Sequence, residues 1–142
     1  DWTHFNDLIA NWTNGTYDRL SLQCILSYVF APVIWLTGVN GEDLALVGRL
    51  LGEKLIMTEF VGYSSLAEMI QNGVFVHTKS VVIATYVLCG FANFASVGIQ
   101  IGGIGGMAPN QKPLLAKYGF RALLGATLAG LMSASMIGMF LE

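Results

Sequence analysis

The sequence predicts an all-α membrane protein with three transmembrane helices, the second of them broken near its middle, one re-entrant helical hairpin and an N-terminal interfacial segment. Two observations lead to this fold class. Hydrophobic residues make up 54% of the 142 residues and charged residues only 11%, whereas soluble domains carry about 25% charged residues. In addition, residues 20–41, 80–111 and 122–141 contain no Asp, Glu, Lys or Arg, and a helix of about 20 apolar residues spans a bilayer.

The same composition excludes two other classes of protein. A disordered chain combines low hydrophobicity with high net charge, but the formal net charge here is -2. A nucleic-acid-binding protein needs a basic face, but seven Lys and Arg residues are outnumbered by nine Asp and Glu residues. We therefore expect the lipid bilayer, and no nucleic acid, as a partner, and a multi-pass location in the cell membrane (plasma or inner).

The N-terminal residues 1–19 are polar, with aromatic side chains spaced along them. This pattern predicts a segment that lies at the membrane interface, where aromatic rings sit at the level of the lipid headgroups. Residues 20–142 form the membrane part of the chain. Its first transmembrane helix is expected over residues 20–41, the first stretch without charges.

Residues 42–72 are amphipathic and predict a re-entrant hairpin. Charged residues recur through this region, so no apolar stretch in it is long enough to cross the bilayer. Apolar residues nevertheless recur with helical spacing, which predicts two helices over residues 42–57 and 59–71, each about 20 Å long. Such a pair can enter the bilayer and return if its tip is buried in protein or lines a cavity. The alternative is a pair of helices in the interface or in an aqueous loop.

The second transmembrane helix is expected over residues 79–108, which is too long for one straight span. Gly90, Asn93 and Ser96 stand close together near its middle, and Asn readily adopts turn conformations. A broken helix here would present backbone groups and half-helix ends to a cavity, as in the midplane sites of secondary transporters. Alternatively, Asn93 and Ser96 hydrogen-bond to a neighbouring helix.

The third transmembrane helix is expected over residues 113–141. It carries a small residue at every fourth position, namely Ala122, Ala126, Gly130, Ala134 and Gly138, and the second span carries Gly98, Gly102 and Gly106 at the same interval. In lipid this spacing lets helix backbones approach one another closely. We therefore expect the spans to pack through these two stripes.

Glu59 is the strongest functional candidate from the residues alone, because it falls at the expected tip of the hairpin. A carboxylate at bilayer depth costs about 2.5 to 3.5 kcal/mol, so it should face a cavity or a partner. If the hairpin is interfacial, Glu59 is simply solvated. Cys24, Cys89, His4 and His77 do not form a ligand-spaced set, so we expect no metal site.

Several motifs, in order along the chain, resemble the concentrative nucleoside transporter family. Residues 51–63, LGEKLIMTEFVGY, resemble the hairpin signature of that family, and residues 84–93, ATYVLCGFAN, resemble its LCGFAN motif. Residues 28–32, YVFAP, are similar to the preceding span, and residues 107–109, MAP, to the loop before the last span. The resemblance covers residues 19–141 and indicates the C-terminal portion of such a transporter.

The resemblance implies a cation-coupled symporter, usually driven by sodium, that carries nucleosides, is not an enzyme and assembles as a homotrimer. Matched motif by motif, it implies that Glu59 hydrogen-bonds to ribose hydroxyls. It also implies that Asn93 and Ser96 contact the ribose and that Phe91 lies beside the nucleoside. This chemistry is reasonable, because a carboxylate accepts hydroxyl protons in charge-assisted bonds and a phenyl face covers the apolar side of a ligand.

The sequence also departs from the family pattern. Thr58 stands where many members have Asn, which bears on ligand selectivity at the tip, and Gly62 stands where many have Ala, which should matter little. The other hairpin of the family and its first broken helix, with the base-reading motif and the sodium ligands, are not in this sequence.

We therefore expect no cofactor, a coupling cation (sodium) bound in the absent N-terminal portion, and a chain that supplies the ribose-contacting half of the substrate site. The alternative function is a structural or assembly membrane domain without its own ligand site, which packs only through its small-residue stripes.

Overall fold

The computed structural model describes residues 22–141, which form helices and no strand. In chain order these are α2 (Leu22–Trp35), the short 3₁₀-helix η1 (Gly41–Asp43), α3 (Leu44–Ile56), α4 (Glu59–Gln71), α5 (Thr78–Leu88), α6 (Phe94–Met107), the 3₁₀-helix η2 (Pro109–Gln111) and α7 (Lys112–Phe140). The interfacial segment expected over residues 1–19 lies outside the described residues.

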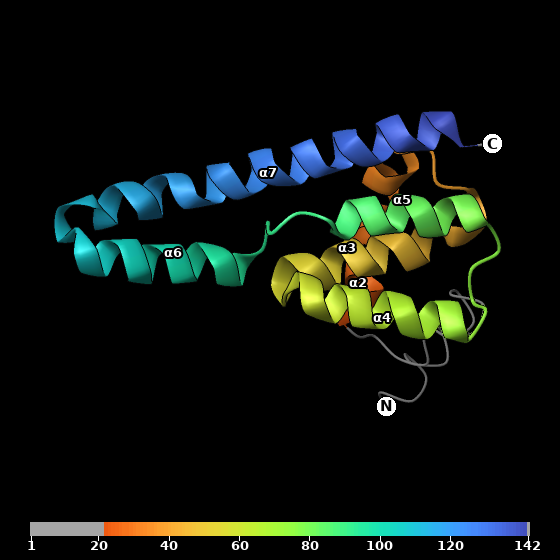
Figure 1. The fold of residues 1–142 in the computed structure, drawn as a ribbon, viewed down its shortest axis with the longest axis horizontal. Coiled ribbons are helices and arrows are strands. Elements are labelled where there is room, and N and C mark those ends of the chain that lie inside the picture. The colour runs from red at the N-terminus through yellow and green to blue at the C-terminus, as the bar shows by residue number, and fades with distance from the viewer. Residues whose placement is uncertain (1–21, 142) are drawn as a thin grey trace, which may run out of the picture.

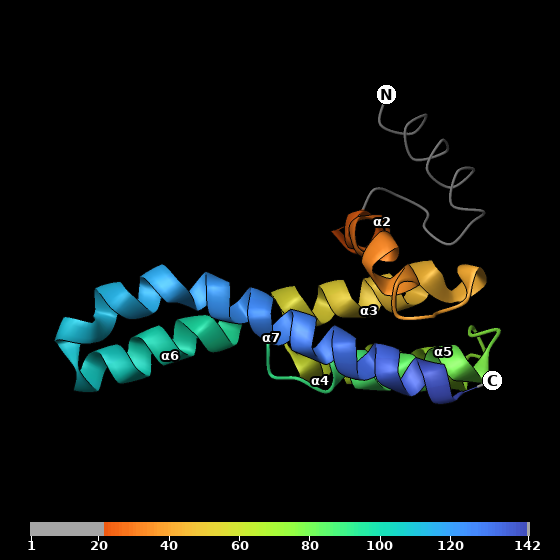
Figure 2. The same cartoon turned by 90° about the horizontal axis from the view of Figure 1, so that it is seen from above.

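Helices α2 to α5 gather at one end of the molecule, and α6 lies at the other end (Figure 1). The long helix α7 runs beside both groups and contacts α5 and α6. Figure 2 shows α2 on one side of α3, with α4 and α5 on the opposite side. Helix α3 is therefore the central helix of the bundle, and it contacts α2, α4 and α5.

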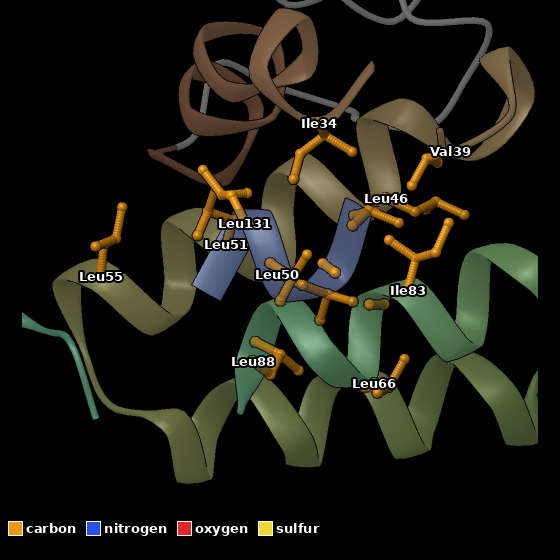
Figure 3. Packing of buried hydrophobic residues seen from close by; sticks show 14 of the residues in the cluster. Ile34, Val39, Leu46, Leu50, Leu51, Leu55, Leu66, Ile83, Leu88 and Leu131 are labelled. Carbon is orange, nitrogen blue, oxygen red and sulfur yellow. The ribbon is translucent and has the colours of Figure 1, made fainter. Parts of the chain in front are cut away.

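The buried core lies around α3. Leu50 and Val47 of this helix are fully buried, and so is Ile83 of α5. Figure 3 shows Leu50, Ile83 and Leu66 of α4 directed toward the space between α3, α4 and α5. The apolar residues whose helical spacing predicted the hairpin therefore face this core.

The hairpin arms were predicted closely. The expected helices over residues 42–57 and 59–71 correspond to α3 and α4, which contact each other and are joined by Met57 and Thr58. Asp43 fixes the open end of the hairpin, because its two carboxylate oxygens accept the backbone N–H groups of Val76 at 3.0 Å and His77 at 3.1 Å. The start of α3 is thereby joined to the loop that leads into α5.

The expected break in the second span is confirmed. Helix α5 ends at Leu88 and α6 begins at Phe94. Asn93 adopts an extended backbone conformation (φ -145°, ψ 164°) and caps the N-terminus of α6. Ser96, the third polar or small residue of the cluster at the break, belongs to the first turn of α6, because the cap at Asn93 restarts the helix before it.

The helix of the first expected span ends before residue 41, because α2 ends at Trp35. Thr37 donates its hydroxyl to the carbonyl of Ile34 at 2.6 Å. Gly38 follows with φ 86°, a left-handed conformation that commonly ends helices and that glycine adopts without strain. The described part of α2 has 14 residues, fewer than the roughly 20 that a straight crossing needs.

Residues 22–141 contain one helix that is long and apolar enough to cross a membrane by itself, Pro109–Phe140 with 32 residues. Its main part, α7, has 29 residues and a length of about 44 Å at 1.5 Å per residue, more than the hydrocarbon core of about 30 Å. The second expected span consists instead of two helices, α5 with 11 residues and α6 with 14.

The two small-residue stripes pack only in part. In α6, a Cβ atom at Gly98, Gly102 or Gly106 would meet no described atom within 4 Å. The α7 stripe packs at its C-terminal end, where a Cβ atom on Gly138 would lie 2.7 Å from the backbone carbonyl oxygen of Thr37. Close approach also occurs outside the stripes, at Gly48 of α3, where a Cβ atom would lie 2.6 Å from the backbone carbonyl oxygen of Ser27 in α2. Sequence spacing identifies a face of a helix, but the helix that lies opposite decides which glycines are needed.

Candidate functional site

The hairpin tip places Glu59 at the first residue of α4. Helix α3 ends at Ile56, and Thr58 precedes α4 in an extended conformation (φ -155°, ψ 164°) without a side-chain capping bond. The Glu59 side chain is 9% exposed. Because the N-terminus of a helix carries a partial positive charge, α4 itself stabilises the carboxylate at this position.

The helix break places Asn93 against Glu59. Asn93 is 1% exposed, and its side-chain amide donates from Nδ2 to Glu59 Oε1 at 2.6 Å. Its side-chain carbonyl oxygen accepts the backbone N–H of Ser96, also at 2.6 Å. The two polar groups that the sequence singled out at separate places, one in the hairpin and one in the second span, thus meet directly.

Glu59 keeps one carboxylate oxygen for another partner. Oε1 accepts a hydrogen bond from Asn93. Oε2 has no hydrogen-bond partner among the residues that the structure describes, and it is not completely shielded from solvent. An ionised carboxylate has about four acceptor positions on its two oxygens. The carboxylate is therefore able to accept hydroxyl protons from a ligand at the tip.

Phe91 and Ser96 lie on a shallow cavity at the break. The cavity has a volume of about 120 Å³ and is lined by Phe91, Ala92, Asn93, Ser96, Val97, Gln100, Ala122, Leu123 and Ala126, the last three from α7. Phe91 is 84% exposed, so no other described residue covers its ring. Glu59 does not line this cavity and reaches its edge through the hydrogen bond to Asn93.

Lys54 is a polar residue at the site that the sequence reasoning missed. It belongs to the last turn of α3, is 1% exposed, and donates from Nζ to the carbonyl oxygen of Val87 in α5 at 2.9 Å. A Cβ atom on Gly90 would lie 3.5 Å from the same nitrogen. A signal was present in the sequence, because Lys54 interrupts the apolar run of Leu50, Leu51 and Leu55.

The described His and Cys residues do not form a metal site. His77 lies at the base of the hairpin, where its Nε2 is 3.4 Å from Glu42 Oε2. Cys89 is a free, exposed thiol in the break. In the part of the chain that the structure describes, no three His, Cys, Asp or Glu residues gather in a group that could hold a metal ion.

A helical hairpin and an interrupted helix whose ends bring polar groups together are the construction of secondary transporters. A family model described as "Na+ dependent nucleoside transporter C-terminus" matches residues 3–138 of this chain. The chain belongs to this family of concentrative nucleoside transporters, as its C-terminal portion. The resemblance found in the motifs is thereby confirmed.

Individual relatives agree with the family. The chain is 42% identical over 122 residues to the uncharacterized transporter YutK of Bacillus subtilis, which covers 86% of this chain and 30% of the relative. It is 38% identical over 148 residues to solute carrier family 28 member 3 of Homo sapiens, covering 94% of this chain and 21% of the relative. It is 36% identical over 148 residues to sodium/nucleoside cotransporter 1 of Mus musculus, covering 94% and 23%.

Solved structures share the fold. The structure of CNTnw in an inward-facing substrate-bound state matches with a TM-score of 0.80 and 32% identity, and the match covers 98% of this chain and 33% of that chain. A variant of CNTnw in an intermediate state matches with a TM-score of 0.81 and 32% identity, covering 98% and 35%. The chain therefore spans about a third or less of the proteins that it matches.

Proposed function

We propose that this chain is part of a cation-coupled nucleoside symporter in the cell membrane and contributes the ribose-contacting half of the substrate site. The observation that carries the proposal is the hydrogen bond of 2.6 Å between Asn93 and Glu59, because it joins the hairpin tip to the helix break. In this proposal α3 and α4 form the re-entrant hairpin, and the tip lies at the depth of the bilayer.

The chemistry of the pair suits a ribose. The ribose of a nucleoside presents two adjacent hydroxyl groups, each able to donate and accept a hydrogen bond. Glu59 Oε2 accepts one hydroxyl proton in a charge-assisted bond, and Asn93 and Ser96 offer further polar groups beside it. The exposed ring of Phe91 covers an apolar face of the ligand.

The cavity supports the notion of half a site. Small-molecule sites usually enclose about 300 to 1,000 Å³, whereas the cavity at the break has about 120 Å³. Other parts of the whole transporter complete it. In this proposal they also bind the coupling cation, which is sodium, as the name of the mouse relative sodium/nucleoside cotransporter 1 suggests. Assembly as a homotrimer stays a prediction from the family resemblance.

The alternative is a structural or assembly domain without its own ligand site. It predicts that Glu59 and Asn93 tolerate alanine, while Gly130→Leu disrupts assembly. The structure favours the transport proposal. A buried carboxylate with only one acceptor oxygen engaged is expensive in lipid unless a ligand engages it.

The test is uptake by the whole transporter that contains this chain. Purified protein in liposomes with an inward sodium gradient should concentrate radiolabelled uridine, and Glu59→Gln should lower the rate at least about thirtyfold, because truncating a buried charged partner costs about 2 kcal/mol or more. Glu68→Gln, the same substitution at an exposed position of α4, is the matched control. Wild-type uptake by the Glu59→Gln protein would exclude the proposed role of Glu59.

A further inference from the structure

Four helix ends meet at the hairpin tip and the break. Helices α3 and α5 end there, at Ile56 and Leu88, and α4 and α6 begin there, at Glu59 and Phe94. The C-terminus of a helix carries a partial negative charge and the N-terminus a partial positive charge. The site therefore has a side that favours a cation and a side that favours an anion.

The two charged side chains occupy these two sides in the favourable order. Lys54 lies in the last turn of α3 and donates to the carbonyl oxygen of Val87 in the last turn of α5, at 2.9 Å. Glu59 is the first residue of α4 and accepts from Asn93, the cap of α6. The ammonium of a residue in the last turn of α3 thus binds the C-terminal end of α5, and the carboxylate at the N-terminus of α4 binds the cap of α6.

Lys54 and Glu59 stand on the two sides of the hairpin tip, and their hydrogen bonds lead to the two ends of the same break, at Val87 and Asn93. The described residues show no direct salt bridge between the two side chains. Both side chains are at least nine-tenths buried, where charges are screened less than at the surface. Leaving a buried charge without its partner is strongly unfavourable.

Few other ionisable groups face this pair from the elements packed around it. Arg49 of α3 is committed to Glu53 at 2.8 Å, and α5 and α6 carry no charged residue after Lys79. The Tyr63 hydroxyl of α4 donates to the carbonyl oxygen of Thr85 at 3.1 Å, and the exposed Cys89 stands in the break. The cations of α7 are Lys112, Lys117 and Arg121, and the latter two lie over the ring of Tyr118.

We propose that Lys54 is a positioning residue for nucleoside binding, which places a positive charge at the junction that holds the Glu59 carboxylate and fixes the hairpin against the helix break. This inference rests on the proposed function, because it assigns Lys54 to the same ribose site. The ammonium does not touch the ligand. It supplies a positive charge for the Glu59 carboxylate, which contacts the ligand. It also fixes the C-terminal end of α5, where the break begins.

The first experiment measures uridine binding to the whole purified transporter at neutral pH. Lys54→Met removes the ammonium beside the carboxylate but keeps a long side chain, so the affinity should fall about tenfold or more. Lys54→Arg keeps a positive charge there and should retain more of the affinity than Lys54→Met. Lys117→Met, which removes an exposed lysine of α7, is the matched control and should behave as the wild type. A Lys54→Met protein with wild-type affinity, or a Lys54→Arg protein that binds as weakly as Lys54→Met, would overturn the proposal.

The second experiment needs no nucleoside, so it separates this inference from the proposed function. Thermal unfolding is measured for the wild type, Lys54→Met, Glu59→Gln and the double variant. Coupling predicts that Lys54→Met lowers the unfolding temperature more when Glu59 is ionisable than when Gln replaces it. If Lys54→Met alone fails to fold but the double variant folds, that result also supports the coupling between Lys54 and Glu59. Equal losses of unfolding temperature in both backgrounds, or failure of both Lys54→Met proteins to fold, would overturn the pairing of Lys54 with Glu59. A wild-type protein that binds no uridine would contradict only the proposed function.

Discussion

The side-chain amide of Asn93 donates to the carboxylate of Glu59 at 2.6 Å, which joins the tip of the α3–α4 hairpin to the break between α5 and α6. The other end of the same amide accepts the backbone N–H of Ser96 and caps α6. One side chain therefore starts a helix and orients a buried carboxylate. The hairpin and the broken helix form a common site because of this double role.

Asn93→Ala should disrupt both roles. The loss of the cap costs about 1 kcal/mol, and Glu59 loses the hydrogen bond that satisfies Oε1, for a further cost of about 1 to 3 kcal/mol. Asn93→Asp retains an oxygen that accepts from Ser96, but it sets a second carboxylate against Glu59. We expect both variants to lower the unfolding temperature of the whole transporter and to abolish uridine uptake. Full uptake by either variant would contradict the role of Asn93.

Phe91→Ala should separate binding from stability. The ring is 84% exposed, so its loss should change the free energy of unfolding by less than about 0.5 kcal/mol. If the ring covers the nucleoside, the KM of uridine uptake should rise about tenfold, corresponding to about 1.4 kcal/mol of binding energy. Leu88→Ala is the contrasting variant, because Leu88 is fully buried and its truncation should cost about 2 to 5 kcal/mol of stability. An unchanged KM for Phe91→Ala would remove Phe91 from the proposed site.

Gly48→Ala should separate α2 from α3. The added Cβ atom would lie 2.6 Å from the backbone carbonyl oxygen of Ser27, and a backbone atom cannot move without moving its helix. We expect a loss of about 1 to 3 kcal/mol in the free energy of unfolding. Gly130→Ala is the control, because its Cβ atom would meet no described atom within 4 Å. Thermal unfolding of the two purified variants measures the difference, and equal unfolding temperatures would contradict the close contact.

Asp43→Asn should loosen the base of the hairpin. Asp43 is fully buried, and both of its oxygens accept backbone N–H groups, from Val76 and His77. An amide replaces one acceptor with an NH₂ group that faces a donor, so we expect a loss of about 1 to 3 kcal/mol. Glu42→Gln changes an exposed neighbour and should change stability by less than about 0.5 kcal/mol. Faster amide hydrogen exchange near residues 74–78 in the Asp43→Asn protein, without a similar change in the control, would locate the effect.

The parts of the fold that were predicted correctly depend on local pattern. The helical spacing of apolar residues located both hairpin arms, and the turn tendency of Asn93 located the end of the break. The C-terminal end of the first helix was placed too late, because absence of charge shows only that residues can lie in lipid, whereas Gly38 and Thr37 decide where α2 ends. The packing stripes were partly right, because Ala134 and Gly138 at the end of the α7 stripe are buried against other parts of the chain. The glycines of the α6 stripe have no described atom near them, since close contact also depends on the helix opposite.

The candidate site was predicted as a set of residues but not as an arrangement. The sequence by itself determined that the chain belongs in a membrane, that Glu59 stands at a helix junction and that the second span breaks near Asn93. Only the tertiary structure decided that these two residues share a hydrogen bond and that Lys54 lies fully buried at the ends of α3 and α5. The physical reason is that helices and breaks follow from interactions between near neighbours in the chain, whereas the pairing of buried polar groups depends on which helix ends the packing brings together.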